Sequence, residues 1–287
     1  MVERCLHKAM VAGSNPAVAT SVMDNRPIGI FDSGVGGLSI LLEIKKLLPN
    51  ESFIFLADQA YVPYGEKTKG ELVERAGRII EFLVKNDVKA VVVACNTSTV
   101  YAIDEMRKRF SLPIIGTVPV IKTIAKISKS KKTAVFSTPA TAESPYLTAL
   151  IKKFAKGVVV YKIGGTGLEE LVEDGKLNDK KVEKILYASL IPLVKNGVDA
   201  IALGCTHYPF LREKIQKIVG RNVKIVDSGP AVARRLRQVL ENNKTLAKNG
   251  ENKKEDYYFT TANTSMFKNV SLLLLKEVLK NVSHIDL

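Results

Sequence analysis

The run Val91-Val92-Val93-Ala94-Cys95-Asn96-Thr97 decides the fold prediction. It closes an apolar, largely β-branched stretch over residues 88–94, which is typical of a strand buried on both faces of a parallel sheet. Amphipathic helical patterns precede it over residues 69–86 and follow it over residues 99–109. The strand therefore lies between two helices, as strands do in α/β proteins.

The same alternation continues outward from this run to both ends of the chain. Short apolar runs predict strands at residues 28–31, 52–56, 88–94, 113–116, 133–136, 157–162, 200–203, 223–226 and 256–260. Longer amphipathic stretches predict helices at residues 38–48, 69–86, 99–109, 121–128, 144–156, 168–174, 179–197, 212–219, 230–242 and 265–282. This order predicts an α/β fold with mainly parallel sheets, flanking helices and right-handed crossovers.

Two parts of the chain repeat one arrangement. A strand, a polar turn and a helix at Ile30–Leu38 recur at Val135–Ser144, and the cysteine-ended strand at Val91–Cys95 recurs at Ala200–Cys205. We therefore expect two similar lobes. Ligands of open α/β sheets bind at the carboxyl ends of the strands, so we expect the active site in the cleft between the lobes. The predicted lobes are residues 26–118 with 227–287, carrying Asp32 and Cys95, and residues 119–226, carrying Thr138 and Cys205.

Residues 1–25 show neither a helical nor an alternating period. Polar and turn-forming residues interrupt any apolar core that a signal peptide would need. We expect this segment to be a disordered extension or the product of an over-extended gene start, with Met23 as the initiator. Cys5 then carries no chemistry.

Composition narrows the class of protein. The 287 residues are 46% hydrophobic and 25% charged, without the roughly 18–20 consecutive apolar residues of a membrane helix. Three cysteines argue against a disulfide framework and favour a reducing cytoplasm. The net charge of +14 is compatible with nucleic-acid binding, with attraction of an acidic substrate, or with lysines on solvated faces. Scattered lysines without interleaved aromatic residues make nucleic acid the least favoured partner.

Cys95 and Cys205 are the candidate reactive groups. At the end of a strand and the start of a helix, backbone N–H groups and the helix dipole are expected to lower the pKa of Cys95, while Asn96 and Thr97 can donate to a carboxylate. The alternative is an inert buried cysteine. Cys205 is followed by Thr206, and by His207, which can hydrogen-bond the thiol or instead serve as a capping or core residue.

Other uses of these groups are less favoured. Zinc sites usually show local Cys-x-x-Cys pairs, which are absent from the sequence, so we expect no metal. A Cys–His nucleophile of a thiol hydrolase would leave Cys95 unexplained. The glycine-rich stretch 29–38 lacks the Lys-Ser/Thr end of a phosphate loop, and Asp32 within it suits a substrate ammonium group or a base that tunes a thiol.

Four ordered segments together resemble the glutamate racemase family of the aspartate/glutamate racemase superfamily. They are Phe31-Asp32-Ser33-Gly34-Val35-Gly36-Gly37-Leu38, Pro63-Tyr64-Gly65, Ala94-Cys95-Asn96-Thr97 and Gly204-Cys205-Thr206-His207-Tyr208-Pro209. The resemblance spans roughly residues 27–270. It implies a homodimeric cytoplasmic isomerase that interconverts L- and D-glutamate without pyridoxal phosphate or another cofactor, and that supplies D-glutamate for peptidoglycan.

The resemblance also implies residue roles. Cys95 would deprotonate D-glutamate and Cys205 would deprotonate L-glutamate, with Asp32 and His207 as auxiliary groups beside the thiols. The substrate would be held by Ser33, Pro63, Tyr64, Gly65, Asn96, Thr97, Thr138, Thr141 and Thr206.

The sequence departs from the family in two places. Residues 117–120 lack an acidic residue that many members carry, and residues 162–167 replace a stretch that often contains Cys-Pro. An aspartate or hydantoin racemase on the same scaffold is the first alternative. The second is a small-anion-binding or redox-sensing protein.

Overall fold

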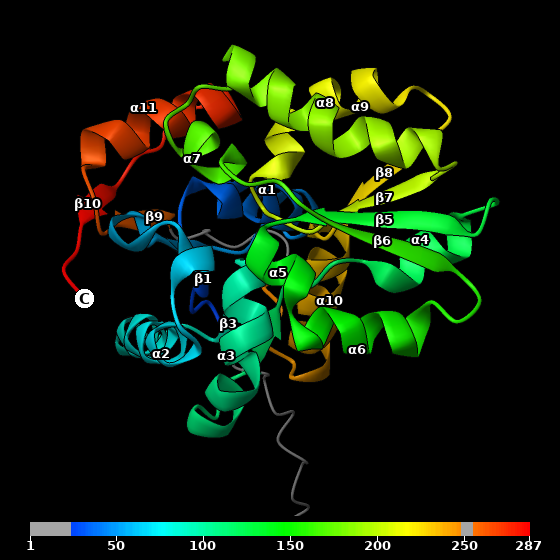
Figure 1. Cartoon of the computed structure of the whole chain (residues 1–287). Helices are drawn as coiled ribbons and strands as arrows, with labels where there is room; N and C mark the ends of the chain where they lie inside the picture. The colour runs from blue at the N-terminus through cyan, green and yellow to red at the C-terminus, as the bar shows by residue number, and fades with distance from the viewer. Residues whose placement is uncertain (1–23, 248–254) are drawn as a thin grey trace, which may run out of the picture.

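The computed structural model describes residues 24–247 and 255–287. The expectation for the extension at residues 1–25 therefore falls almost entirely outside the described residues. The described chain forms two parallel sheets with helices on both sides of each, so the predicted fold class is confirmed (Figure 1).

The first sheet has the strand order β10-β9-β2-β1-β3-β4, and every pair of neighbours is parallel. Its strands are β1 (Ile28–Asp32), β2 (Phe53–Ala57), β3 (Ala90–Val93), β4 (Ile114–Gly116), β9 (Tyr257–Thr260) and β10 (Val282–His284). Alternate side chains of a strand enter opposite cores. Phe31 packs with the apolar faces of α2 (Lys69–Lys85) and α3 (Asn96–Arg109), whereas Ile30 packs in the core that includes α1 (Leu38–Leu47).

The second sheet has the order β6-β5-β7-β8, again with all neighbours parallel. Its strands are β5 (Lys132–Ser137), β6 (Val159–Gly164), β7 (Ala200–Leu203) and β8 (Lys224–Asp227). Figure 1 shows α8 (Lys180–Lys195) and α9 (Arg212–Val219) above this sheet, with α4 (Ile121–Ile127) and α6 (Pro145–Phe154) below it. The remaining helices are α5 (Pro139–Glu143), α7 (Leu168–Glu173), α10 (Gly229–Asn242) and α11 (Thr264–Leu275).

The predicted repeat of the two lobes is visible in the strand orders. β2-β1-β3-β4 corresponds to β6-β5-β7-β8, so the strand that precedes each cysteine lies beside the first strand of its lobe. The lobe boundaries at residues 118 and 227 stay a prediction.

Two predicted elements need correction. The helix expected at 99–109 begins at Asn96, because Cys95 caps it by accepting the Ser98 N–H at its sulfur. The helix expected at 265–282 ends at Leu275, where Lys276 adopts a left-handed conformation with φ 57°. The chain then pairs with β9 as β10, since the sheet edge satisfies its backbone groups.

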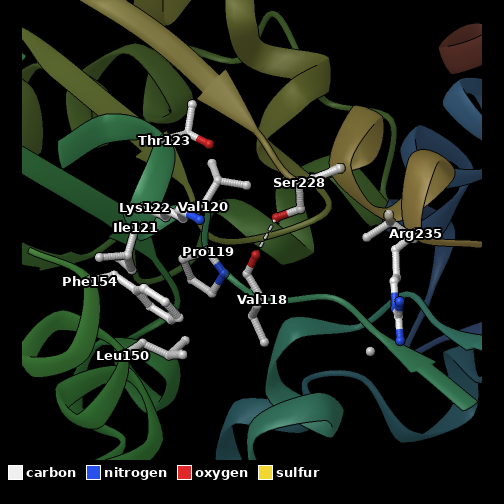
Figure 2. A pocket seen from close by; sticks show the side chains of 13 residues that line it. Val118, Pro119, Val120, Ile121, Lys122, Thr123, Leu150, Phe154, Ser228 and Arg235 are labelled. Carbon is white, nitrogen blue, oxygen red and sulfur yellow. Dashed lines mark hydrogen bonds between the residues drawn. The ribbon is translucent and has the colours of Figure 1, made fainter. Parts of the chain in front are cut away.

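The chain passes between the two lobes at residues 117–120 and again after β8. The Ser228 hydroxyl donates to the Val118 carbonyl over 2.8 Å and ties the two crossings together (Figure 2). A pocket of about 310 Å³ beside this hydrogen bond is lined by Gly116, Val118, Pro119, Val120, Ile121, Lys122, Thr123, Leu150, Phe154, Ser228, Ala231, Val232 and Arg235. None of the predicted site residues lines this pocket.

Within the described ranges, no helix combines the length and apolar character needed to cross a membrane.

Candidate active site

The carboxyl ends of the two sheets meet, and their polar side chains contact each other directly. Thr206, after β7, donates to both carboxylate oxygens of Asp32 at the end of β1, each over 3.4 Å. Thr97, in the first turn of α3, shares hydrogen bonds with Thr138 (3.4 Å) and Thr141 (3.3 Å) of the other lobe. The expected convergence of strand ends is therefore confirmed for these five residues.

Cys95 is buried at the N-terminus of α3. Its sulfur accepts the Ser98 N–H over 3.4 Å, and its thiol lies 3.7 Å from the Ser33 hydroxyl. Burial, reinforced by the nearby Asp32 carboxylate, raises the pKa of the Cys95 thiol well above its ordinary value. The expected lowering by the helix N-terminus is thus wrong in its net direction, because desolvation of a thiolate outweighs one backbone hydrogen bond.

Cys205 begins a hydrogen-bonded chain of three side chains. Its sulfur lies 3.5 Å from His207 Nδ1, and His207 Nε2 lies 2.6 Å from Glu173 Oε1. Burial raises the pKa of Cys205 to about 11. Burial alone would lower the pKa of His207, but Cys205 and Glu173 outweigh it and hold that pKa well above its ordinary value. A raised pKa keeps the ring in its imidazolium form, with Nε2–H donated to Glu173 and Nδ1–H facing the Cys205 sulfur, so the ring can stabilise a thiolate there.

Glu173 contacts the candidate site, and the sequence reasoning did not include it. Besides His207, its carboxylate accepts the Val35 N–H over 2.6 Å and the Gln59 side-chain amide over 2.7 Å. The helix α7 carries Glu169 and Glu170 as well, and nothing in the sequence distinguishes the glutamate that reaches the histidine. A search for acidic residues on the helices before Cys205 finds the three glutamates of α7. It does not indicate which of them contacts His207.

Asp32 is fully buried at the glycine-rich turn after β1. Its carboxylate accepts the N–H groups of Gly37 (2.8 Å) and Gly34 (3.4 Å), while burial raises its pKa. The turn also lies against the second lobe, since a Cβ on Gly36 would fall 2.6 Å from both His207 Nδ1 and Thr206 Oγ1. Glycine is required there by this close approach of the backbone to the Cys205 side of the site.

Asn96 presents an unused acceptor at the site. Its side chain is 3% exposed, and its Oδ1 has no hydrogen-bond partner in the described part of the chain. Buried polar atoms are rarely left unpaired, so an orphaned amide oxygen one residue from Cys95 points to a ligand that donates a hydrogen bond.

The loop with Pro63, Tyr64 and Gly65 lies beside Cys95 and forms one side of the candidate site. The Tyr64 hydroxyl donates to Asp58 over 2.6 Å, and Tyr64 lies in one apolar cluster with Cys95 and Leu72. Gly65 approaches the other lobe, where its Cβ position lies 3.7 Å from Ala140. The backbone carbonyl of Pro63 accepts the Glu66 N–H.

The arrangement supplies two thiols, each with its own acid–base neighbours. Cys205 is close enough to Cys95 to add slightly to the raised pKa of the Cys95 thiol, whose main cause is burial. Two such groups from opposite lobes can act as base and acid on opposite sides of one carbon atom.

The chain is similar to known racemases. The model of a family described as Asp/Glu/Hydantoin racemase matches residues 39–236. A glutamate racemase of Deinococcus radiodurans is 40% identical over 268 residues, which cover 93% of this chain and 91% of that protein. The crystal structure of a Bacillus anthracis glutamate racemase superposes with a TM-score of 0.82 at 32% identity, covering 92% of this chain and 98% of that one. An Escherichia coli glutamate racemase, solved with L-glutamate and the activator UDP-MurNAc-Ala, gives a TM-score of 0.80 at 30% identity, with 91% and 98% covered.

Proposed function

The chain belongs to the Asp/Glu/hydantoin racemase family, and from this premise we propose that it interconverts L- and D-glutamate by a two-thiol mechanism. The observation that carries the proposal is the pair Cys95 and Cys205, buried at equivalent strand ends of two similar lobes. The identity of about 40% to a curated glutamate racemase over nearly the whole chain supports glutamate as the substrate.

In the direction from L to D, the Cys205 thiolate removes the α-proton and the Cys95 thiol delivers a proton to the opposite face. The C–H bonding electrons stay on the substrate as a carbanion until the new C–H bond takes them up. Cys205 ends as a thiol and Cys95 as a thiolate, and proton exchange with solvent resets the pair. The reverse direction exchanges the two roles.

His207 and Asp32 adjust the two thiols. Both thiols are protonated in the resting site, because burial raises their pKa values. The imidazolium of His207, stabilised by Glu173, lies beside Cys205, so the thiolate that forms when the thiol loses its proton to solvent is next to a cation. Asp32 influences Cys95 electrostatically and contacts Thr206, which places a carboxylate where a substrate ammonium group can neutralise it.

The remaining polar residues suit the charged ends of an amino acid. The orphaned Asn96 Oδ1 can accept from the α-ammonium group. The hydroxyl groups can donate to the two carboxylates and stabilise charge that develops during proton transfer, and Tyr64 with Pro63 and Gly65 shields the thiol from water. The proposed donors are those of Ser33, Thr97, Thr138, Thr141 and Thr206.

Proton NMR in D2O tests the reaction and the role of each thiol. The purified chain, without added cofactor, is given L-glutamate, D-glutamate and L-aspartate separately, and circular dichroism follows optical activity. We expect deuterium at the α-carbon together with loss of optical activity for glutamate. Exchange with aspartate alone would place the chain among the aspartate racemases, and no exchange with either would refute the proposal.

Single cysteine variants separate the two roles. Cys95→Ala retains the base for L-glutamate, so we expect it to exchange the α-proton of L-glutamate while forming no D-glutamate. Cys205→Ala should do the same for D-glutamate only. Exchange of the opposite enantiomers would reverse the assignment.

The proposal extends to the assembly and the cellular role. We propose a cytoplasmic homodimer that supplies D-glutamate for peptidoglycan. Exposed apolar side chains on and after α11, Leu272, Leu273 and Val278, offer a surface for a second copy. Light scattering on the eluted protein should give twice the chain mass, and a monomer at micromolar concentration would contradict the dimer.

A further inference from the structure

Glu169, Cys205 and His207 form a cluster that the racemisation chemistry does not fully use. One ligand atom from each lies within 4.8 Å of the other two, and all three side chains are buried. The Glu169 side chain is 9% exposed, and its carboxylate makes no hydrogen bond within residues 24–247 and 255–287. An unpartnered acidic group is therefore aimed at the thiol and the imidazole.

The donor set is that of a zinc site. Thiolate sulfur, imidazole nitrogen and carboxylate oxygen are the three ligand types that Zn²⁺ takes, and three protein ligands leave one position open. Tetrahedral zinc with ordinary bond lengths places its ligand atoms about 3.3–3.8 Å apart. The separation of 3.5 Å between Cys205 Sγ and His207 Nδ1 falls in this range. The sequence alone does not reveal this site. Glu169 lies on α7, far in sequence from Cys205 and His207, and the three residues do not form the local Cys-x-x-Cys pattern typical of zinc sites.

The second nitrogen of His207 is already arranged for metal binding. Its Nε2 lies 2.6 Å from the Glu173 carboxylate, which leaves Nδ1 as the atom facing Cys205. Histidine ligands of zinc nearly always donate their other N–H to such a group, which fixes the ring and raises its basicity.

We propose that Glu169, Cys205 and His207 bind Zn²⁺ and that the bound ion reversibly inhibits the enzyme by competing with its substrate. As the zinc–sulfur bond forms, the thiol proton passes to solvent, and the sulfur lone pair that would accept the α-proton is taken by the metal. The inhibition rests on the proposed function of Cys205, whereas the binding itself does not.

Cobalt binding tests the site without any turnover. Metal-free full-length chain carrying Cys5→Ala is titrated with Co²⁺ alone under argon, so that only Cys95 and Cys205 can supply sulfur. We expect one equivalent to bind with a thiolate-to-cobalt absorption band and the visible bands of tetrahedral cobalt, and Zn²⁺ to displace it. Cys205→Ala should abolish the thiolate band, and Cys95→Ala should leave it.

Glutamate-to-glutamine variants test whether a glutamate binds the metal directly or only adds negative charge nearby. Glu169→Gln should weaken cobalt binding at least tenfold, and Glu173→Gln should weaken it about 10- to 100-fold through the histidine. Glu170→Gln, on the same helix but exposed, is the matched control and should bind as the parent does. Equal affinity of Glu169→Gln and Glu170→Gln, or a thiolate band that survives Cys205→Ala, would overturn the site.

Competition with substrate tests the inhibitory role. D-Glutamate at saturation should suppress the cobalt spectrum, and added Zn²⁺ should raise the apparent KM for glutamate while a chelator restores it. Simultaneous binding of cobalt and D-glutamate would overturn the competition. A chain that binds cobalt as expected yet exchanges no α-proton would refute the racemase function and leave the metal site standing.

Discussion

Replacing Glu173 by glutamine tests whether this carboxylate controls Cys205 through His207. Glu173 Oε1 lies 2.6 Å from His207 Nε2 and accepts the Val35 N–H, while Oε2 accepts from Gln59. Glutamine keeps the shape and removes the charge that stabilises the imidazolium. Glu173 acts as a positioning residue, because it reaches the thiol only through the ring.

Typical hydrogen-bond energies bound the size of the effect. A hydrogen bond to a charged group contributes about 1.5–3 kcal/mol and a neutral one about 0.5–1.5 kcal/mol. If the glutamine amide keeps its contact, about 1 kcal/mol is lost, and if it turns away from the ring the loss approaches about 3 kcal/mol. At about 1.36 kcal/mol for each factor of ten, kcat/KM should fall between about 5-fold and about 150-fold.

The assay is circular dichroism of racemisation, started from each enantiomer across a range of pH. The two enantiomers have equal free energies in water, so kcat/KM must fall equally in both directions. Glu173 helps to raise the pKa of His207, so the limb of the pH profile that reports this group should move to lower pH in Glu173→Gln.

Glu170→Gln is the control, because this side chain lies on the same helix and is exposed. A kcat/KM for Glu173→Gln within twofold of the control, with an unmoved pH limb, would refute the proposed chain from carboxylate to thiol.

Three further outcomes are expected. Gly36→Ala would place a Cβ 2.6 Å from His207 Nδ1, so racemisation should fall about 100-fold with little change in the unfolding temperature; near-normal activity would contradict the close contact. Lys89→Met leaves the buried Glu51 carboxylate without its cation and should lower the free energy of unfolding by about 3–5 kcal/mol. An unchanged midpoint of urea unfolding would show that the ion pair contributes little. The pKa of Cys205 is raised to about 11 by burial, so its contribution to stability is present below pH 9 and lost as pH rises toward 11. Between pH 9 and pH 11, the free energy of unfolding should therefore fall by about 3 kcal/mol less in Cys205→Ala than in the parent chain. An equal fall in both, measured by denaturant unfolding, would argue against the raised pKa.

The sequence predicts the architecture because its signals are local. Helical and strand periodicities depend only on neighbouring residues, and the cysteine-ended strand repeats with the same polar sequel in each half. Ligands bind at the carboxyl ends of parallel strands, and this rule predicts that Asp32, Cys95, Thr138 and Cys205 lie near one another. The contacts between the two lobes agree with that prediction. The substrate-binding roles assigned from the resemblance stay predictions.

What the sequence missed depends on burial and on contacts between distant segments. The N-terminal position of Cys95 on its helix predicts a lowered thiol pKa, yet the pKa is raised, because desolvation is set by everything packed around the sulfur. The short strand β10 exists because the edge of β9 can pair with it, which no local period reveals.

Sequence alone thus determined the α/β class, the two-lobed repeat and the two candidate thiols, because each of these signals lies in short stretches of neighbouring residues. Tertiary structure decided which glutamate of α7 supports His207 and which one faces Cys205 without a partner. The physical reason is that hydrogen bonds and burial are fixed by packing across lobes, and residues far apart in the chain meet only when the two sheets are in place.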